Sequence, residues 1–90
     1  MYHASALRRD ICALLSEREL RGQQLKRTLE GHYDQRVKHD TFYRALEELE
    51  ELGHVESRTE GIHDVYALTS GGERALREHV AWLNEQVEKE

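Results

Sequence analysis

A chain of 90 residues with a net charge of −5 is long enough for one small domain, and no apolar run approaches the roughly 20 residues that cross a bilayer, which excludes a membrane protein. Cys12 is the only cysteine, which excludes a disulfide framework and a zinc site of four cysteines. The opening residues lack the apolar core of a signal peptide, so we expect a cytoplasmic protein.

Apolar residues at helical spacing predict two helices in the first third of the chain. The first runs from about Ser5 to Glu17, with Cys12 as a small core side chain, and residues 18–21 after it can pair briefly as a strand. The second begins after Gly22 and ends near Gly31, a residue suited to a helix C-terminus. The apolar stripes are Leu7, Ile11, Leu14 and Leu15 in the first helix and Leu25 and Leu29 in the second.

A third helix is predicted from about His39 to Leu52, and it has the most regular period in the chain. Gly53 can end this helix because glycine takes the left-handed conformation without strain. Val37 precedes the helix and can fill the core. The residues of the core-facing stripe are Phe42, Ala45, Leu46, Leu49 and Leu52.

The pattern then changes from helical to alternating. Residues 54–59 and 63–68 alternate about the turn Glu60-Gly61, which predicts a β-hairpin. A final helix starts at Thr69, with Ser70 and Glu73 as a capping box. Its apolar residues Leu76, Val80, Leu83 and Val87 step by four, three and four positions, a seam of about two heptads, and Trp82 widens this face.

The order helix, helix, helix, hairpin, long helix predicts an α+β, mostly α, winged helix-turn-helix fold. The second and third helices form the turn motif, the third lies in the major groove, and the hairpin is the wing. We expect residues 1–69 to form the DNA-binding domain and residues 70–90 to form a C-terminal dimerisation helix.

The distribution of charge supports a nucleic-acid partner. Residues 1–45 hold nine Lys and Arg against six Asp and Glu, a balance of +3, whereas residues 46–90 hold four against twelve, a balance of −8. A basic half joined to an acidic half indicates a nucleic-acid-binding face. Arginine outnumbers lysine ten to three; an acidic, lysine-poor surface would suit a salt-rich cytoplasm, but genome base composition can also favour arginine.

The start of the third helix carries the side chains that suit a DNA reader, which needs cations for phosphates and forked side chains for base edges. Arg44 can bind guanine through two hydrogen bonds or clamp a phosphate. Four carboxylates in residues 47–51 would lie away from the DNA. The predicted contact residues of this helix are Lys38, His39, Thr41, Tyr43 and Arg44, and ordinary solvated surface is the alternative interpretation.

Two further regions are predicted to reach DNA. Gln23, Gln24 and Arg27 of the second helix can hold the phosphate backbone, although a solvated face explains them almost as well. Arg58 of the wing can enter a minor groove, but the acidic residues around it repel DNA.

The apolar face of the final helix predicts a dimer. A lone helix with such a face must bury it, and an isologous contact with the same helix of a second subunit does so. Packing within one chain is the alternative. The predicted interface residues are Leu76, Val80, Trp82, Leu83 and Val87.

Six histidines raise the question of a metal. His3, His32, His39, His54, His63 and His79 include no pair four residues apart on one helix, and we expect no metal and no cofactor. A site shared across a dimer is the alternative. We find no nucleophile–base pair and no glycine-rich phosphate loop, so we expect that the protein is not an enzyme.

Several segments together resemble the PadR family of transcriptional regulators, over roughly residues 7–88. They are Ile11-Cys12-Ala13-Leu14-Leu15, Leu20-Arg21-Gly22-Gln23-Gln24-Leu25, Val37 through Leu46, Leu49-Glu50-Glu51-Leu52-Gly53-His54-Val55 and Val65-Tyr66-Ala67-Leu68-Thr69. The resemblance implies that Thr41-Phe42-Tyr43 through Leu46 is the recognition helix and that Tyr66 through Gly72 closes the wing and opens the dimer helix.

The resemblance also implies a homodimer with paired C-terminal helices that represses a nearby operon or its own gene. Some members respond to phenolic or other hydrophobic molecules at the dimer interface. This chain departs from the family in having Arg21-Gly22-Gln23 in place of His-Gly-Tyr, and His39-Asp40 in place of proline and glycine. One helix follows the wing, as in a compact branch, which leaves little room for a large ligand pocket.

We therefore predict a sequence-specific DNA-binding transcriptional regulator, a repressor that binds a pseudo-palindromic operator as a homodimer. Its partners are double-stranded DNA and a second copy of itself, with no membrane; the sequence leaves a small-molecule effector open. The alternative is a winged helix that contacts proteins without binding DNA, which the net charge of −5 favours.

Overall fold

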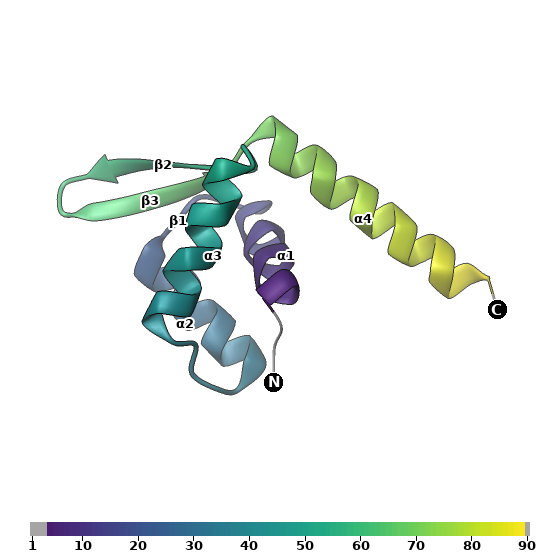
Figure 1. Ribbon diagram of the computed structural model, residues 1–90, viewed down its shortest axis with the longest axis horizontal. Helices are drawn as coiled ribbons and strands as arrows, with labels where there is room; N and C mark the ends of the chain where they lie inside the picture. Colours follow the sequence, from purple (N-terminus) through teal and green to yellow (C-terminus); the bar gives the residue numbers. More distant parts are fainter. Residues whose placement is uncertain (1–3, 90) are drawn as a thin grey trace.

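The computed structural model describes residues 4–89, so the opening residues, His3 among them, and Glu90 lie outside the part described. Figure 1 shows a body of helices and a small sheet from which one long helix departs. The elements in chain order are α1 (Ala4–Leu15), β1 (Leu20–Arg21), α2 (Gly22–Tyr33), α3 (His39–Glu51), β2 (Val55–Glu60), β3 (His63–Leu68) and α4 (Ser70–Glu88). The predicted winged helix-turn-helix fold is confirmed.

The sheet is antiparallel in the order β1-β3-β2, so β3 lies between the other two strands. The short strand expected in residues 18–21 is present and pairs with β3, with Leu20 opposite Tyr66. In the hairpin, Glu60 is opposite His63, and Gly61 has a φ of 63°, a left-handed value that suits glycine. The hairpin turn is therefore Gly61-Ile62, one residue later than predicted.

The core lies between α1, α2, α3 and the sheet. Phe42 of α3 and Leu7, Ile11 and Leu25 of the two preceding helices are fully buried. Burying a side chain of this size stabilises the fold by about 1.5–3 kcal/mol, so these residues hold the three helices together. Cys12 is buried as predicted, and that burial raises the pKa of its thiol.

One predicted core residue and two predicted helix ends are wrong. Leu52 is exposed, because α3 ends at Glu51 and the chain turns away there. Gly31 lies inside α2, and the left-handed residue that ends this helix is Asp34, with a φ of 54°. The N-cap of α4 is Thr69 rather than Ser70, since the Thr69 hydroxyl accepts a hydrogen bond from the Gly72 N–H at 3.0 Å.

The end of α3 and the start of α4 are bound tightly to each other. Gly53 adopts a φ of 76° and ends α3 as predicted. The Thr69 hydroxyl donates to the Gly53 carbonyl at 2.6 Å, and the Thr69 N–H donates to the His54 carbonyl at 3.0 Å. A Cβ at Gly72 would lie 2.1 Å from the His54 oxygen, so only glycine lets α4 start this close to α3.

Beyond this junction α4 extends away from the body as an arm (Figure 1), and the described chain measures 49 × 30 × 20 Å. Leu76 packs against the core, but Val80, Trp82, Leu83 and Val87 farther along are exposed. In the described residues, none of the helices is both long and apolar enough to cross a membrane.

Candidate nucleic-acid and subunit interfaces

The first turn of α2 packs directly on α3 through Gly22. A Cβ at this position would lie 2.8 Å from the Tyr43 hydroxyl and 3.3 Å from the Tyr66 ring. Tyr43 also meets Phe42 edge-on, with ring centroids 4.9 Å apart, and His39 at 4.5 Å. Tyr43 is therefore half-buried and packs between the start of α2 and the rest of α3.

The turn between α2 and α3 is held by Glu30. Its carboxylate accepts a hydrogen bond from the Val37 N–H at 2.9 Å and one from the Lys26 ammonium at 3.1 Å. The Val37 hydrogen bond, followed by the hydrogen bond from Lys26, keeps the pKa of Glu30 below its usual range. Val37 itself fills the core, as predicted, and Lys38 then starts α3 as its N-cap.

Several predicted DNA-contact residues meet in one hollow of about 340 Å³. Gln23 and Arg27 reach it from α2, and His39 and Tyr43 reach it from α3. Lys38 lies at the rim of a second hollow of about 550 Å³, together with Lys26 and Arg36. Sequence reasoning missed Arg36, although its place in the polar connector before α3 was a usable signal.

The other predicted residues of α2 and α3 lie in different settings. The Gln24 side chain accepts a hydrogen bond from the Arg21 N–H at 3.1 Å, so it caps the start of α2. Thr41 is half-buried. Arg44 is exposed on α3, and within residues 4–89 its guanidinium forms no ion pair or hydrogen bond.

The wing arginine is fully engaged within the chain. The two terminal nitrogens of Arg58 donate to the two carboxylate oxygens of Glu19 at 2.7 and 2.8 Å. Its Nε and one terminal nitrogen also donate to Glu60, at 2.9 and 2.6 Å. These hydrogen bonds from Arg58 hold the pKa of Glu19 below its usual range and raise the pKa of Arg58. Glu60 was recognisable as a neighbour in sequence, but Glu19 was not.

The carboxylates of α3 are concentrated in its second half. Glu48 forms an ion pair with Arg8 of α1 at 3.2 Å, whereas Glu47 and Glu51 are exposed. One carboxylate oxygen of Glu50 is buried, and in the described part of the chain it has no hydrogen-bond partner. Arg44, the cation of α3, thus lies in its first half together with Asp40, and the other carboxylates lie in its second half.

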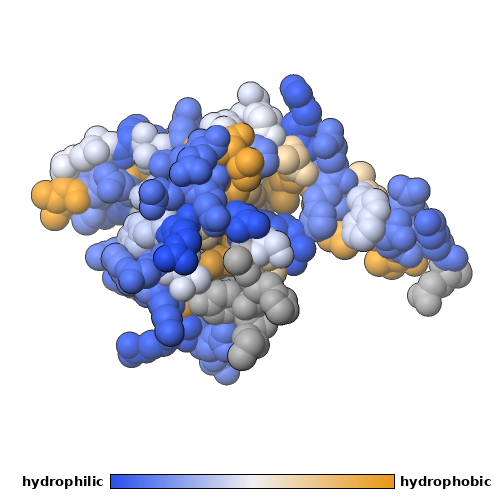
Figure 2. All heavy atoms as spheres, viewed as in Figure 1, coloured by the Kyte–Doolittle hydropathy of each residue, from blue (hydrophilic) through white to orange (hydrophobic). Residues whose placement is uncertain are grey.

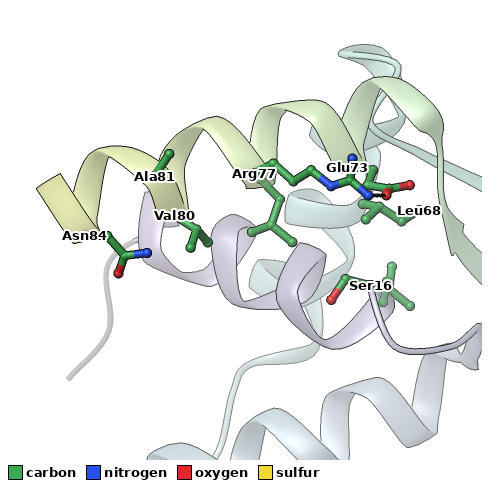
Figure 3. A pocket seen from close by; sticks show the side chains of 9 residues that line it. Ser16, Leu68, Glu73, Arg77, Val80, Ala81 and Asn84 are labelled. Atoms are coloured by element: carbon green, nitrogen blue, oxygen red, sulfur yellow. Dashed lines mark hydrogen bonds and ion pairs between the residues drawn. The ribbon is translucent and has the colours of Figure 1, made fainter.

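The exposed apolar side chains of α4 lie along one side of the arm. Figure 2 shows hydrophobic surface on the lower side of α4, and the side chains that form this stripe are Val80, Leu83 and Val87. A groove of about 580 Å³ lies between α4 and the end of α1 (Figure 3), where Val80 projects from α4 over α1. Trp82 is also exposed, and its ring stacks on that of His79 with centroids 6.1 Å apart.

The described residues contain no group of three or more His, Cys, Asp or Glu side chains that could hold a metal ion. His39 packs on Tyr43, and His79 lies 3.4 Å from an Arg9 nitrogen and stacks on Trp82. The geometry therefore offers binding surfaces of two kinds, a polar and cationic one on α2 and α3 and an apolar one on α4.

Comparisons with known proteins agree with this geometry. The model of the transcriptional regulator PadR-like family matches residues 11–78. Among solved structures, H. salinarum RosR is 30% identical with a TM-score of 0.85, covering 90% of this chain and 74% of RosR. A transcriptional regulator from Clostridium thermocellum has the same fold, with 21% identity, a TM-score of 0.77 and coverage of 91% and 84%.

A third solved structure is Bacillus subtilis PadR in complex with operator DNA. It is 25% identical to this chain with a TM-score of 0.71, and the match covers 82% of this chain but 47% of PadR. A comparison with curated proteins finds no significant match.

Proposed function

Because the chain belongs to the PadR-like family of transcriptional regulators, we propose that it represses transcription by binding a pseudo-palindromic operator as a homodimer. The observation that carries this proposal is the hollow between α2 and α3, where amide, cationic and aromatic side chains of both helices converge. Base edges and phosphates are recognised by these side-chain types.

Arg44 is the residue to which we assign base reading. It is exposed in the second turn of α3, and its five donors are free of partners within residues 4–89, so its fork is available for a guanine. Arg27 lines the hollow between α2 and α3, and Lys38 lines the second hollow with Lys26 and Arg36. These cations suit phosphates. Tyr43 packs against the start of α2, Gln24 caps that helix, and Gln23, His39 and Thr41 supply further polar contacts.

The stripe on α4 is the surface to which we assign the second subunit. Three of its apolar side chains are each more than two-fifths exposed, at 46% for Val80, 41% for Leu83 and 72% for Val87. An isologous contact would bury this stripe with Trp82 and fill part of the groove beside α1. In this scheme residues 1–69 form the DNA-binding domain and residues 70–90 the dimerisation helix.

Two copies joined through α4 would present two copies of α3 to DNA, which is why we propose an operator with two half-sites. We place the protein in the cytoplasm with its DNA. Leu76, the first residue of the predicted seam, serves both the core of its own chain and the start of the subunit contact.

Fluorescence anisotropy tests the proposal with the wild-type protein and duplex DNA from upstream of its own gene, against a scrambled duplex. We expect saturable preference for the first duplex and loss of that preference in Arg44→Ala. Arg74→Ala is the matched control, because Arg74 is also exposed but lies on α4 outside the apolar stripe.

Negligible binding to every duplex, including fragments drawn from the whole genome, would contradict the proposal. That outcome would favour a winged helix that contacts proteins, which the net charge of −5 and the acidic wing support.

A further inference from the structure

The ion pair between Arg58 and Glu19 joins two distant parts of the sheet. Arg58 of β2 lies opposite Val65 of β3, and Val65 lies in turn opposite Arg21 of β1. Glu19 directly precedes β1, so the Arg58 side chain crosses β3 to reach it. The ion pair therefore spans the whole width of the sheet and joins residues 39 positions apart in the chain.

The guanidinium fork of Arg58 has the geometry that would also suit a phosphate. Arginine binds carboxylates and phosphates alike through two parallel N–H···O bonds. Here both oxygens of Glu19 occupy the fork, and Glu60 takes the remaining Nε donor. Two carboxylates around one guanidinium leave this cluster with a net charge of −1, so the wing as folded repels a duplex instead of attracting it.

The ion pair between Arg58 and Glu19 lies where Arg58 can exchange Glu19 for another anion. The side chains of Arg58 and Glu19 are 46% and 52% exposed, so solvent and salt screen their attraction. The wing projects from the body beyond α2 and α3 (Figure 1). A dense row of phosphates beside the wing would compete directly with Glu19 for the same donors.

We propose that Glu19 is a positioning residue that competes with DNA phosphate for Arg58 and so restrains the contribution of the wing to DNA binding. The proposal rests on the proposed function in taking DNA as the partner. The wing then adds a phosphate contact only when Arg58 exchanges Glu19 for DNA, and affinity in the resting state comes from α2 and α3.

Glu19→Gln tests the proposal, since glutamine keeps the size of the side chain and removes its charge. Glu56→Gln is the matched control: Glu56 lies on the same strand as Arg58, two residues before it, and within residues 4–89 forms no ion pair. Both variants remove one negative charge near the wing. Arg58→Ala and the double variant Glu19→Gln/Arg58→Ala complete a double-mutant cycle.

The measurement is anisotropy with a random-sequence duplex and with the duplex from upstream of the gene, over a series of salt concentrations. We expect Glu19→Gln to tighten binding to both duplexes about threefold to tenfold at low salt, and to steepen the salt slope by about 0.9, the value for one added phosphate contact. Glu56→Gln should leave the slope unchanged. Arg58→Ala alone should change the affinity and the salt slope little. In the double variant it should abolish the gain in affinity that Glu19→Gln produces.

Equal effects of Glu19→Gln and Glu56→Gln on affinity and slope would overturn the proposal, since the gain would then be one of general charge. A large loss in Arg58→Ala alone would also overturn it, because Arg58 would already bind DNA. If the four variants change affinity and salt slope as expected but neither duplex is preferred, the proposed operator binding fails. The proposal that Glu19 restrains Arg58 then still holds. If none of the variants binds any duplex, both fail. Thermal unfolding of each variant verifies that it is folded.

Discussion

The helix-turn-helix of α2 and α3 and the wing of β2 and β3 both carry arginine, but they use it in opposite ways. Within residues 4–89, Arg27 and Arg44 form no ion pair, whereas Arg58 of the wing binds two carboxylates. The difference arises from the surroundings, because Glu19 and Glu60 lie within reach of Arg58, whereas no acid within residues 4–89 forms an ion pair with Arg44. An arginine is available for DNA without competition only where the fold leaves its fork empty.

The two regions also differ in how they are attached to the body. Both attachments depend on a crowded glycine, Gly22 for α2 and Gly72 for the junction between the wing and α4. At Gly22 the nearest atom is the hydroxyl of a side chain, which can move. At Gly72 it is a backbone oxygen of His54, which cannot move without shifting β2. The attachment of α2 therefore tolerates a side chain at its glycine better than the junction between the wing and α4 does.

Gly72→Ala should have the largest effect of the changes considered. The added Cβ would lie 2.1 Å from the His54 oxygen, so α4 must shift away from α3 and the wing. We expect a loss of about 3 kcal/mol in the free energy of unfolding, at the upper end for overpacking. Urea denaturation measures it. Gly71→Ala is the control, since its nearest neighbour would be 3.5 Å away, and an equal loss there would contradict the argument.

Arg44→Ala compared with Arg58→Ala is the direct test of the contrast between the two regions. Loss of a guanine contact removes about 1–3 kcal/mol of discrimination between operator and scrambled DNA, a factor of about 5 to 150. Arg58→Ala should leave the discrimination within about twofold, because its guanidinium is already bound within the chain. Anisotropy with both duplexes provides the comparison, and a larger loss at Arg58 than at Arg44 would reverse our assignment.

Gly22→Ala should have a smaller effect on stability and a clear effect on binding. The Tyr43 hydroxyl, 2.8 Å from the new Cβ, can swing aside, so we expect a loss of about 1 kcal/mol in the free energy of unfolding. The angle between α2 and α3 changes with it, and DNA affinity should fall further than stability explains. Gly31→Ala is the control, because open space surrounds that position in α2. Unchanged affinity in Gly22→Ala would show that this packing does not set the reading geometry.

Alkaline pH should loosen the packing beneath the wing. Burial, with the nearby charge of Asp64 added, raises the pKa of Tyr66 to about 12 from its ordinary value of 10.0. A folded-state pKa above the unfolded value gives stability that is complete below pH 10.0 and is lost as pH rises toward about 12. Absorbance of tyrosinate during a pH titration follows this group, and Tyr66→Phe should remove the late step. Ionisation of Tyr66 near the ordinary value of 10.0 would contradict the burial argument.

Acid should have the smallest effect and should act on both regions. Hydrogen bonds from Arg58 and from the Val37 N–H hold the pKa of Glu19 and of Glu30 below the ordinary value of 4.5. A lowered folded-state pKa gives stability that is present above pH 4.5 and is lost as pH falls through the folded value. Glu19→Gln and Glu30→Gln should each flatten this part of the stability profile in thermal unfolding. A profile identical to that of the wild type would show that these contacts do not persist in solution.

The sequence by itself determined the elements, because their signals are local. The periods of α1, α3 and α4 and the alternation of β2 and β3 are properties of neighbouring residues, and Gly53 ends α3 because the left-handed conformation is open to glycine. The same locality explains why the sequence predicts the residues at the start of α3 as candidate readers.

Only the tertiary structure decided what each side chain is free to do. Arg58 is occupied because the strand order β1-β3-β2 brings it within reach of Glu19, and Tyr43 serves packing because Gly22 lets α2 approach it. Leu52 is exposed because the chain leaves the core at the end of α3. These outcomes depend on residues far apart in the chain, and the distances between such residues are set by how the elements pack, which no local pattern contains.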